Sequence, residues 1–179
     1  MFLSDIDIKK AVAQGEITLS DFDEKRVQPA SYDILLGEKF LVFDTHSTPF
    51  IDPVQKILPN YREIIIPEGE TFTLHPGVSL LGISKDYFGS SKYLIQLSGK
   101  SSLARIGLIV HNTAGLINPG HYLNIAFELC NLNSVPIVLR PGMEIAQLIF
   151  ADISSPPEHG YEKTGRYATE NWTSYKPKD

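Results

Sequence analysis

The strongest constraint on the fold is a set of Pro-Gly pairs that separate short apolar runs. The pairs stand at 76–77, 119–120 and 141–142, and each is a turn signal. The runs are rich in β-branched, aromatic and leucine residues, and we predict a strand for each: 31–37, 39–43, 63–67, 71–77, 78–84, 93–99, 108–112, 124–132, 136–142 and 145–151. Many short strands with regular turns predict an antiparallel barrel or sandwich.

One segment near the N-terminus, SDIDIKKAVAQGEI, predicts a helix. Ser4 is a suitable N-cap, with Asp7 three residues later as in a capping box. An apolar stripe of Ile8, Ala11 and Val12 follows, and Gly15 ends the helix.

The bulk composition limits the class of protein. The chain has 179 residues, enough for one domain, and no linker divides it, so we expect a single domain over 1–179. A net charge of -5 argues against a protein that coats nucleic acid. The single cysteine excludes an internal disulfide and a multi-cysteine zinc site, and no apolar run is long enough to span a membrane. We therefore expect a cytoplasmic protein without a nucleic-acid or membrane partner.

The segment GKSSLAR at 99–105 has the residue types that bind phosphate. It is not an ATPase phosphate-binding loop, because that motif needs a glycine where this chain has Leu94. If Ser101 or Ser102 opens a helical turn, backbone N–H groups and hydroxyls would face an anion, and Arg105 would add a cation. The alternative is a plain surface loop.

Two further stretches carry candidate residues. In a strand at 124–132, Ile125, Phe127 and Leu129 would face one side, and Ala126, Glu128 and Cys130 the other. Glu128 would then be either an exposed acid or a partly buried general base.

The segment 111–122 contains Asn118, which could bond a sugar hydroxyl or stabilise its turn. His111 and His121 raise the question of a metal, but neither has a second ligand at a recognised spacing, and the zinc-deaminase signature is absent.

The C-terminal stretch 154–179 is polar and carries cations and aromatic rings: Lys163, Arg166, Lys176, Lys178, Tyr161, Tyr167, Trp172 and Tyr175. A surface tail and a flexible arm that closes over a ligand both fit this composition.

Together these stretches resemble the dCTP deaminase family, relatives of the trimeric dUTPases. The resemblance runs almost from end to end: LSDIDI, VQPASYDILLG, FIDP, LHPG, GKSSLARIGLIVHNTAG, LRPGMEIAQLIF and SPPEHGYEKTGRY. It implies a mainly β, dUTPase-like β-clip or distorted β-barrel with a short N-terminal helix, assembled as a homotrimer with shared sites. Residues from about 156 onward would form a flexible lid.

The resemblance also implies a reaction, namely zinc-independent hydrolysis of dCTP to dUTP and ammonia for dUMP and dTTP synthesis. Mg²⁺ would be carried on the triphosphate, and dUTP and dTTP are further candidate ligands. Glu128 falls at the catalytic glutamate, which takes a proton from the water that attacks C4. Ser101, Arg105 and the Ala114 carbonyl would organise this centre. The nucleotide-binding positions would be Lys100, Ser101, Ser102, Arg105, Asn118, Ala126, Phe127, Glu128, Gln147, Tyr161, Arg166 and Glu170.

Within that set, Asn118 would meet the deoxyribose 3′-hydroxyl and Phe127 would lie along the base. Lys100, Ser101 and Ser102 would hold phosphates, and Gln147, Tyr161 and Arg166 would help to hold the triphosphate.

Several positions depart from the family pattern. Gly115 resembles the members that also cleave dUTP to dUMP and pyrophosphate, yet Asn118 stands where the family generally has an aspartate that helps to activate water. HYLN at 121–124 replaces a usual aromatic–small–glycine run, and Glu170 stands where the lid usually has glutamine. We therefore expect a dUTP-forming deaminase first, a dUMP-forming bifunctional enzyme second, and a non-catalytic nucleotide-binding regulator third.

Overall fold

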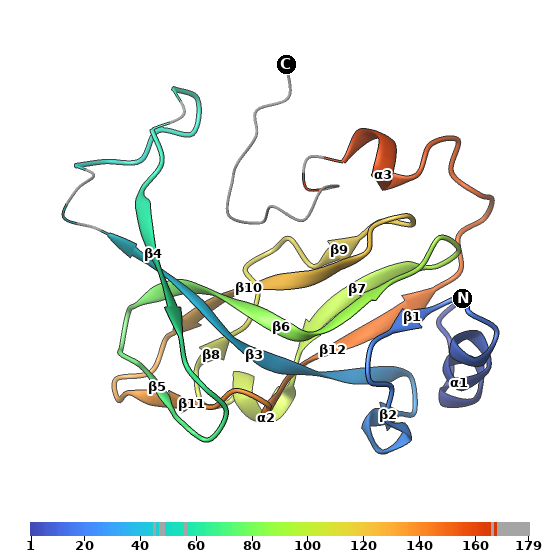
Figure 1. Cartoon of the computed structure of the whole chain (residues 1–179), viewed down its shortest axis with the longest axis horizontal. Helices are drawn as coiled ribbons and strands as arrows, with labels where there is room; N and C mark the ends of the chain where they lie inside the picture. The colour runs from blue at the N-terminus through green and yellow to red at the C-terminus, as the bar shows by residue number, and fades with distance from the viewer. Residues whose placement is uncertain (45, 47–48, 56, 166, 168–179) are drawn as a thin grey trace.

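Antiparallel strands form most of the chain in a computed structural model that describes residues 1–44, 46, 49–55, 57–165 and 167. Short helices and turns connect the strands, which curl around a central core (Figure 1). The elements are α1 (Asp5–Ala13), β1 (Thr18–Leu19), the 3₁₀ turn η1 (Glu24–Arg26), β2 (Val27–Gln28), β3 (Ser31–Asp44), β4 (Asn60–Ile65), β5 (Phe72–Leu74), β6 (Ser79–Gly89), β7 (Leu94–Gly99), α2 (Ser101–Ala104), β8 (Leu108–Ile109), β9 (Leu116–Ile117), β10 (Leu123–Asn131), β11 (Ile137–Leu139), β12 (Glu144–Ala151) and α3 (Tyr161–Thr164).

The main sheet has the strand order β8-β10-β6-β3-β12-β7-β9, with β1 added to β6 and with β2 and β4 added to β3. Strands β5 and β11 form a separate pair. Every ladder among the described residues is antiparallel. The mainly β prediction is confirmed. The predicted barrel appears as a curled sheet whose path, in the described residues, does not return to its first strand.

Strand β3 corrects the prediction of separate strands at 31–37 and 39–43, because it runs unbroken from Ser31 to Asp44. The pairing with β6 shifts register between Leu36 and Phe40. Gly37 lies in this irregular part, where a Cβ would meet the Ile83 carbonyl oxygen at 2.9 Å. Glycine thus lets the strand bend against β6 and continue, rather than end there.

Helix α1 agrees with the prediction from its caps. The Ser4 side chain accepts a hydrogen bond from the Asp7 N–H, and the helix buries Ile8 and Ala11. The chain leaves the helix through Gly15, whose φ of +72° suits glycine.

The predicted Pro-Gly turns are also confirmed. In each, the N–H after the glycine donates to the carbonyl three residues earlier, from Val78, His121 and Met143 respectively. Gly77, Gly120 and Gly142 have φ between +72° and +84°, as a type II turn requires at its third position.

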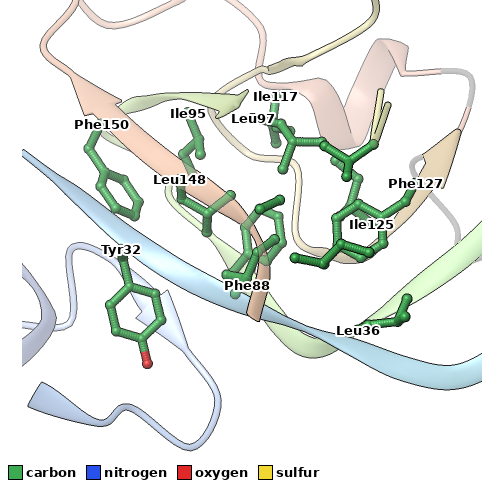
Figure 2. Packing of buried hydrophobic residues seen from close by; sticks show 14 of the residues in the cluster. Tyr32, Leu36, Phe88, Ile95, Leu97, Ile117, Ile125, Phe127, Leu148 and Phe150 are labelled. Atoms are coloured by element: carbon green, nitrogen blue, oxygen red, sulfur yellow. The ribbon is translucent and has the colours of Figure 1, made fainter. Parts of the chain in front are cut away.

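The core fills the inside of the curl with side chains from most of the long strands (Figure 2). On β10 the alternation is as predicted, with Ile125, Phe127 and Leu129 buried and their neighbours partly exposed. This places Glu128 on the opposite face of the strand from the core.

A buried ion pair fastens the N-terminal part to the sheet. Arg26 donates to Asp86 at 2.7 Å, and the second Asp86 oxygen accepts from the Leu35 N–H at 2.7 Å. The guanidinium also lies over the Tyr32 ring, 4.8 Å from its centroid. One carboxylate therefore connects η1, β3 and β6.

Candidate functional site

The segment 99–105 forms the helical turn that the sequence indicated. Lys100 is the N-cap of α2, and Ser101 and Ser102 are its exposed first residues. The first N–H groups of a helix have no partner within it, so this turn presents donors beside two hydroxyls. Arg105 follows α2 on the surface, and its guanidinium makes no ion pair with the described residues.

Lys100 and Gln147 converge on a buried carboxylate that the sequence did not single out. The Lys100 ammonium contacts Asp33 at 2.5 Å, and the Gln147 amide donates to the other Asp33 oxygen at 3.3 Å. Gln28 donates to Asp33 at 3.0 Å. Strand pairing explains this meeting, because Asp33 on β3 lies opposite Gln147 on β12.

Glu144 is a second carboxylate at Lys100, with its oxygen 2.7 Å from the ammonium. Burial by itself lowers the pKa of Lys100, but the bonds to Asp33 and Glu144 outweigh burial, so the pKa is raised. Lys100 is therefore a permanent cation at the base of α2.

Glu128 is held in place by the backbone of the segment that follows β8. Its Oε2 accepts a hydrogen bond from the Asn112 N–H at 2.9 Å. Among the described residues, Oε1 accepts no hydrogen bond, and the side chain is half-buried. The carboxylate is thus oriented by one oxygen while the other is left to take a proton, as a general base requires.

Asn118 lies in the second Pro-Gly turn. The turn is closed by the backbone oxygen of Asn118 and the His121 N–H at 3.1 Å, so the side-chain amide is not needed to hold it. The exposed amide is available to a ligand. Contact of this amide with a sugar hydroxyl stays a prediction.

Helix α3 docks on this same turn. The Tyr161 N–H donates to the Pro119 carbonyl at 3.0 Å, and the Tyr161 ring stacks on His121. The start of the predicted lid therefore lies beside Asn118.

The predicted residues fall into separate groups within one chain. Figure 1 shows α2 at the lower edge of the molecule and α3 at the upper edge. Helix α2, which carries the phosphate-seeking residues, therefore lies apart from α3 and from the Pro-Gly turn that α3 contacts.

The remaining predicted positions have varied surroundings. Ala114 is exposed in the bend before β9, and Ala126 is half-buried on the face of Glu128. The Phe127 side chain is wholly buried among core residues, so it does not lie along a surface where a base could bind, and only its backbone could contact one (Figure 2). Arg166 and Glu170 lie outside the described residues.

Gly115 is enclosed by its neighbours. A Cβ at this position would meet the Leu97 carbonyl oxygen at 2.8 Å and the His111 ring at 3.2 Å. The Gly115 carbonyl accepts from the Leu97 N–H at 2.7 Å, so β9 and β7 meet closely here. His111 therefore packs against this glycine, and a larger residue would need the backbone to move.

Two surface hollows lie away from the predicted residues. One, of about 420 Å³, lies between β3, β6 and the 141–142 turn, and the other, of about 310 Å³, lies beside α1. Within the described residues, no three His, Cys, Asp or Glu side chains form a group that could hold a metal ion. No described helix is long and apolar enough to cross a membrane.

The predicted site residues did not include Asp33, Glu144 or the Asn112 N–H. A signal exists for Asp33, because this acid interrupts the apolar run 31–37 and is buried, which is unusual for an acid. Its partners come from other strands, and only the pairing register identifies them.

Comparison with known proteins identifies the family of this architecture. A family model described as dCTP deaminase-like matches residues 2–153. The chain is 40% identical over 170 residues to a dUMP-forming dCTP deaminase of Bifidobacterium animalis subsp. lactis, covering 93% of this chain and 88% of the relative. It is 42% identical over 162 residues to a dUMP-forming dCTP deaminase of Tropheryma whipplei, covering 90% and 83%.

A relative named simply dCTP deaminase, from Halorubrum lacusprofundi, is 38% identical over 174 residues, covering 93% of this chain and 86% of the relative. Among solved structures, a 2′-deoxycytidine 5′-triphosphate deaminase from Agrobacterium tumefaciens matches with a TM-score of 0.63 at 22% identity. The match covers 83% of this chain but 46% of that one. At this identity the match shows a shared fold.

Proposed function

This chain belongs to the dCTP deaminase-like family, and from that membership we propose that it is an enzyme that deaminates dCTP and releases dUMP. The observation that carries the proposal is Glu128, a half-buried carboxylate fixed through one oxygen by the Asn112 N–H. A nucleotide-binding regulator would have no need for such a base.

In the proposed deamination, Glu128 takes a proton from the water that attacks C4 of the cytosine ring and passes it toward the departing ammonia. Ser101, Arg105 and the Ala114 carbonyl organise the centre. Arg105 carries a charge without an ion-pair partner among the described residues, which suits an anionic ligand.

The nucleotide is held at both ends. The phosphates are bound by Lys100, Ser101, Ser102 and Gln147. The 3′-hydroxyl of the sugar is bound by Asn118. The base lies beside Ala126 and the Phe127 backbone. Lys100 and Arg105 would face a triphosphate whose charge a bound Mg²⁺ would lower. The lid would begin near residue 156, with Tyr161 beside Asn118.

We propose that neighbouring copies complete the site in a homotrimer. The distance between α2 and α3 in one chain supports this, because both groups are needed around one nucleotide (Figure 1).

The release of dUMP was the second expectation from the sequence, and the names of the relatives now favour it over dUTP. Gly115 supports it also, because a glycine at this position resembles the members that cleave dUTP, and its neighbours Leu97 and His111 leave no room for a larger residue. Asn118 is the one feature that favours the dUTP-forming enzyme, since an amide cannot take a proton from water.

The test is a product assay on purified protein with dCTP and Mg²⁺ that separates ammonia, dUTP and dUMP. Ammonia with dUMP and pyrophosphate is the expected result. Ammonia with dUTP alone would move the proposal to the dUTP-forming enzyme, and nucleotide binding without ammonia would move it to the regulator.

A further inference from the structure

Lys100 has two carboxylate partners that differ sharply in burial. The Asp33 side chain is 1% exposed and the Glu144 side chain is 45% exposed. Both are close enough to the ammonium to bond it at once. Their different surroundings give the two contacts different energetic roles.

Asp33 is a fixed partner. Its carboxylate also accepts hydrogen bonds from Gln28 and Gln147, so four polar side chains form one network. Separating Lys100 from Asp33 would leave a buried charge unpaired, which is costly. Asp33 therefore fixes the position of the Lys100 ammonium relative to the Gln147 amide.

Glu144 is a replaceable partner. Its half-exposed carboxylate can turn into water at little cost, because exposed ion pairs contribute little to stability. Lys100 has no other anion among the described residues. An incoming phosphate oxygen would be a third anion at an ammonium that already contacts two carboxylates. Repulsion among the three would displace Glu144, the exposed one.

We propose that Glu144 is an internal competitor of the substrate triphosphate at Lys100, while Asp33 is the positioning residue that keeps Lys100 and Gln147 directed at the phosphates. This inference rests on the proposed function for the identity of the anion. Glu144 neutralises Lys100 in the empty site, and its displacement lowers the affinity for the nucleotide.

The test compares Glu144→Gln with the wild type. Removing the competitor lowers KM for dCTP by about two- to fivefold, the range of an exposed ion pair. The matched control is Glu63→Gln, because Glu63 is 46% exposed and pairs with Lys39 at 3.3 Å away from this site. We expect the control to leave KM unchanged. General structural damage from Glu144→Gln would raise KM, not lower it.

Two further variants separate the roles. In a Lys100→Ala background, Glu144→Gln changes nothing, because the competition needs the ammonium. Asp33→Asn raises KM, because Lys100 and Gln147 lose their common anchor. If Asp33→Asn fails to fold, the pair of variants at Lys100 and Glu144 still decides the question.

A direct binding measurement separates this inference from the proposed function. Inorganic tripolyphosphate, titrated calorimetrically into the protein at low ionic strength, should bind Glu144→Gln more tightly than the wild type. If the wild type releases no ammonia from dCTP but this difference appears, the proposed function fails and the competition stands. Equal binding of tripolyphosphate, or an unchanged KM in Glu144→Gln, overturns the competition.

Discussion

His121 and Tyr161 lie face to face, with ring centroids 3.9 Å apart and planes inclined by 19°. The contact joins the turn that carries Asn118 to the first residue of α3. His121 is 9% exposed, so the stack is almost closed to water. Its position beside Asn118 means that a change in this stack reaches the proposed sugar site directly.

The first prediction concerns pH. Burial lowers the pKa of His121, and the Tyr167 backbone offsets this in part. Below the ordinary value of 6.5, the unfolded chain binds the proton more readily than the folded one, so stability falls as pH falls through that range. On α3, the charged residues that follow Tyr161 are Glu162 and Lys163, and both are exposed.

Thermal unfolding between about pH 5 and pH 8, where histidine titrates, should show a loss of stability on acidification that His121→Phe reduces. His159→Gln is the control, because His159 is exposed and should leave the slope as in the wild type. Identical slopes for the wild type and His121→Phe would contradict the prediction.

The second prediction is that Gly115→Ala destabilises the fold by about 1–3 kcal/mol, the usual cost of overpacking. The new Cβ would meet the Leu97 carbonyl oxygen at 2.8 Å, which is backbone and cannot rotate away. Gly99→Ala is the control, because its nearest neighbour is the Val110 side chain at 3.3 Å. Denaturant unfolding measures both, and equal losses would show that backbone crowding is not the cause.

The third prediction is that Asp86→Asn lowers the free energy of unfolding by about 3–5 kcal/mol, as expected when a buried ion pair loses one charge. Arg26 is 7% exposed, so its charge would stay buried without its counter-ion. Glu24→Gln removes the exposed pair with Lys9 and should cost about 0–1 kcal/mol. A similar small loss for Asp86→Asn would mean that Arg26 finds water or another acceptor.

Local signals predicted much of the fold. The cap at Ser4, the Pro-Gly turns and the alternation of β10 are all decided by residues near in sequence, and all three agree with the structure. Strand β3 was predicted as two strands, because its continuity through Gly37 depends on the pairing with β6. The two-residue strands β1 and β9 were missed because distant partners define them, and β2 was missed although its partner follows closely in the chain.

The candidate site also combines features that are visible locally in the sequence with contacts that only the fold creates. Chemistry-bearing residues such as Glu128 and Lys100 are visible in the sequence. Their partners Asn112 and Asp33 depend on register across strands that are far apart in the chain. For Phe127, strand alternation correctly predicted a side chain on the core face, where it is buried, whereas its contact with the cytosine base is a prediction that rests on the family resemblance.

The fourth prediction is that Glu128→Gln slows ammonia release from dCTP by about 10²- to 10⁴-fold, the range for a positioned acid–base group. The amide keeps the size of the side chain and can still accept from the Asn112 N–H, so dCTP binding should persist. Ammonia release and equilibrium binding are measured on the same protein. Turnover at the wild-type rate would remove Glu128 from the catalytic role.

The fifth prediction concerns the second half of the proposed reaction. Asn118→Asp supplies a carboxylate where the chain has an amide that can bond a hydroxyl but cannot take a proton. The turn should persist, because the backbone oxygen of residue 118 closes it. If water activation limits cleavage, the rate of dUMP formation from dUTP should rise by about 10²-fold, the lower end for a general base.

Deamination of dCTP should change little, since Glu128 performs that step. Gln55→Glu is the control, because it adds the same charge at an exposed amide side chain in the loop before β4. A rise in dUMP formation would show that Asn118 limits the second step, whereas an unchanged rate would mean that another group of the enzyme activates the water.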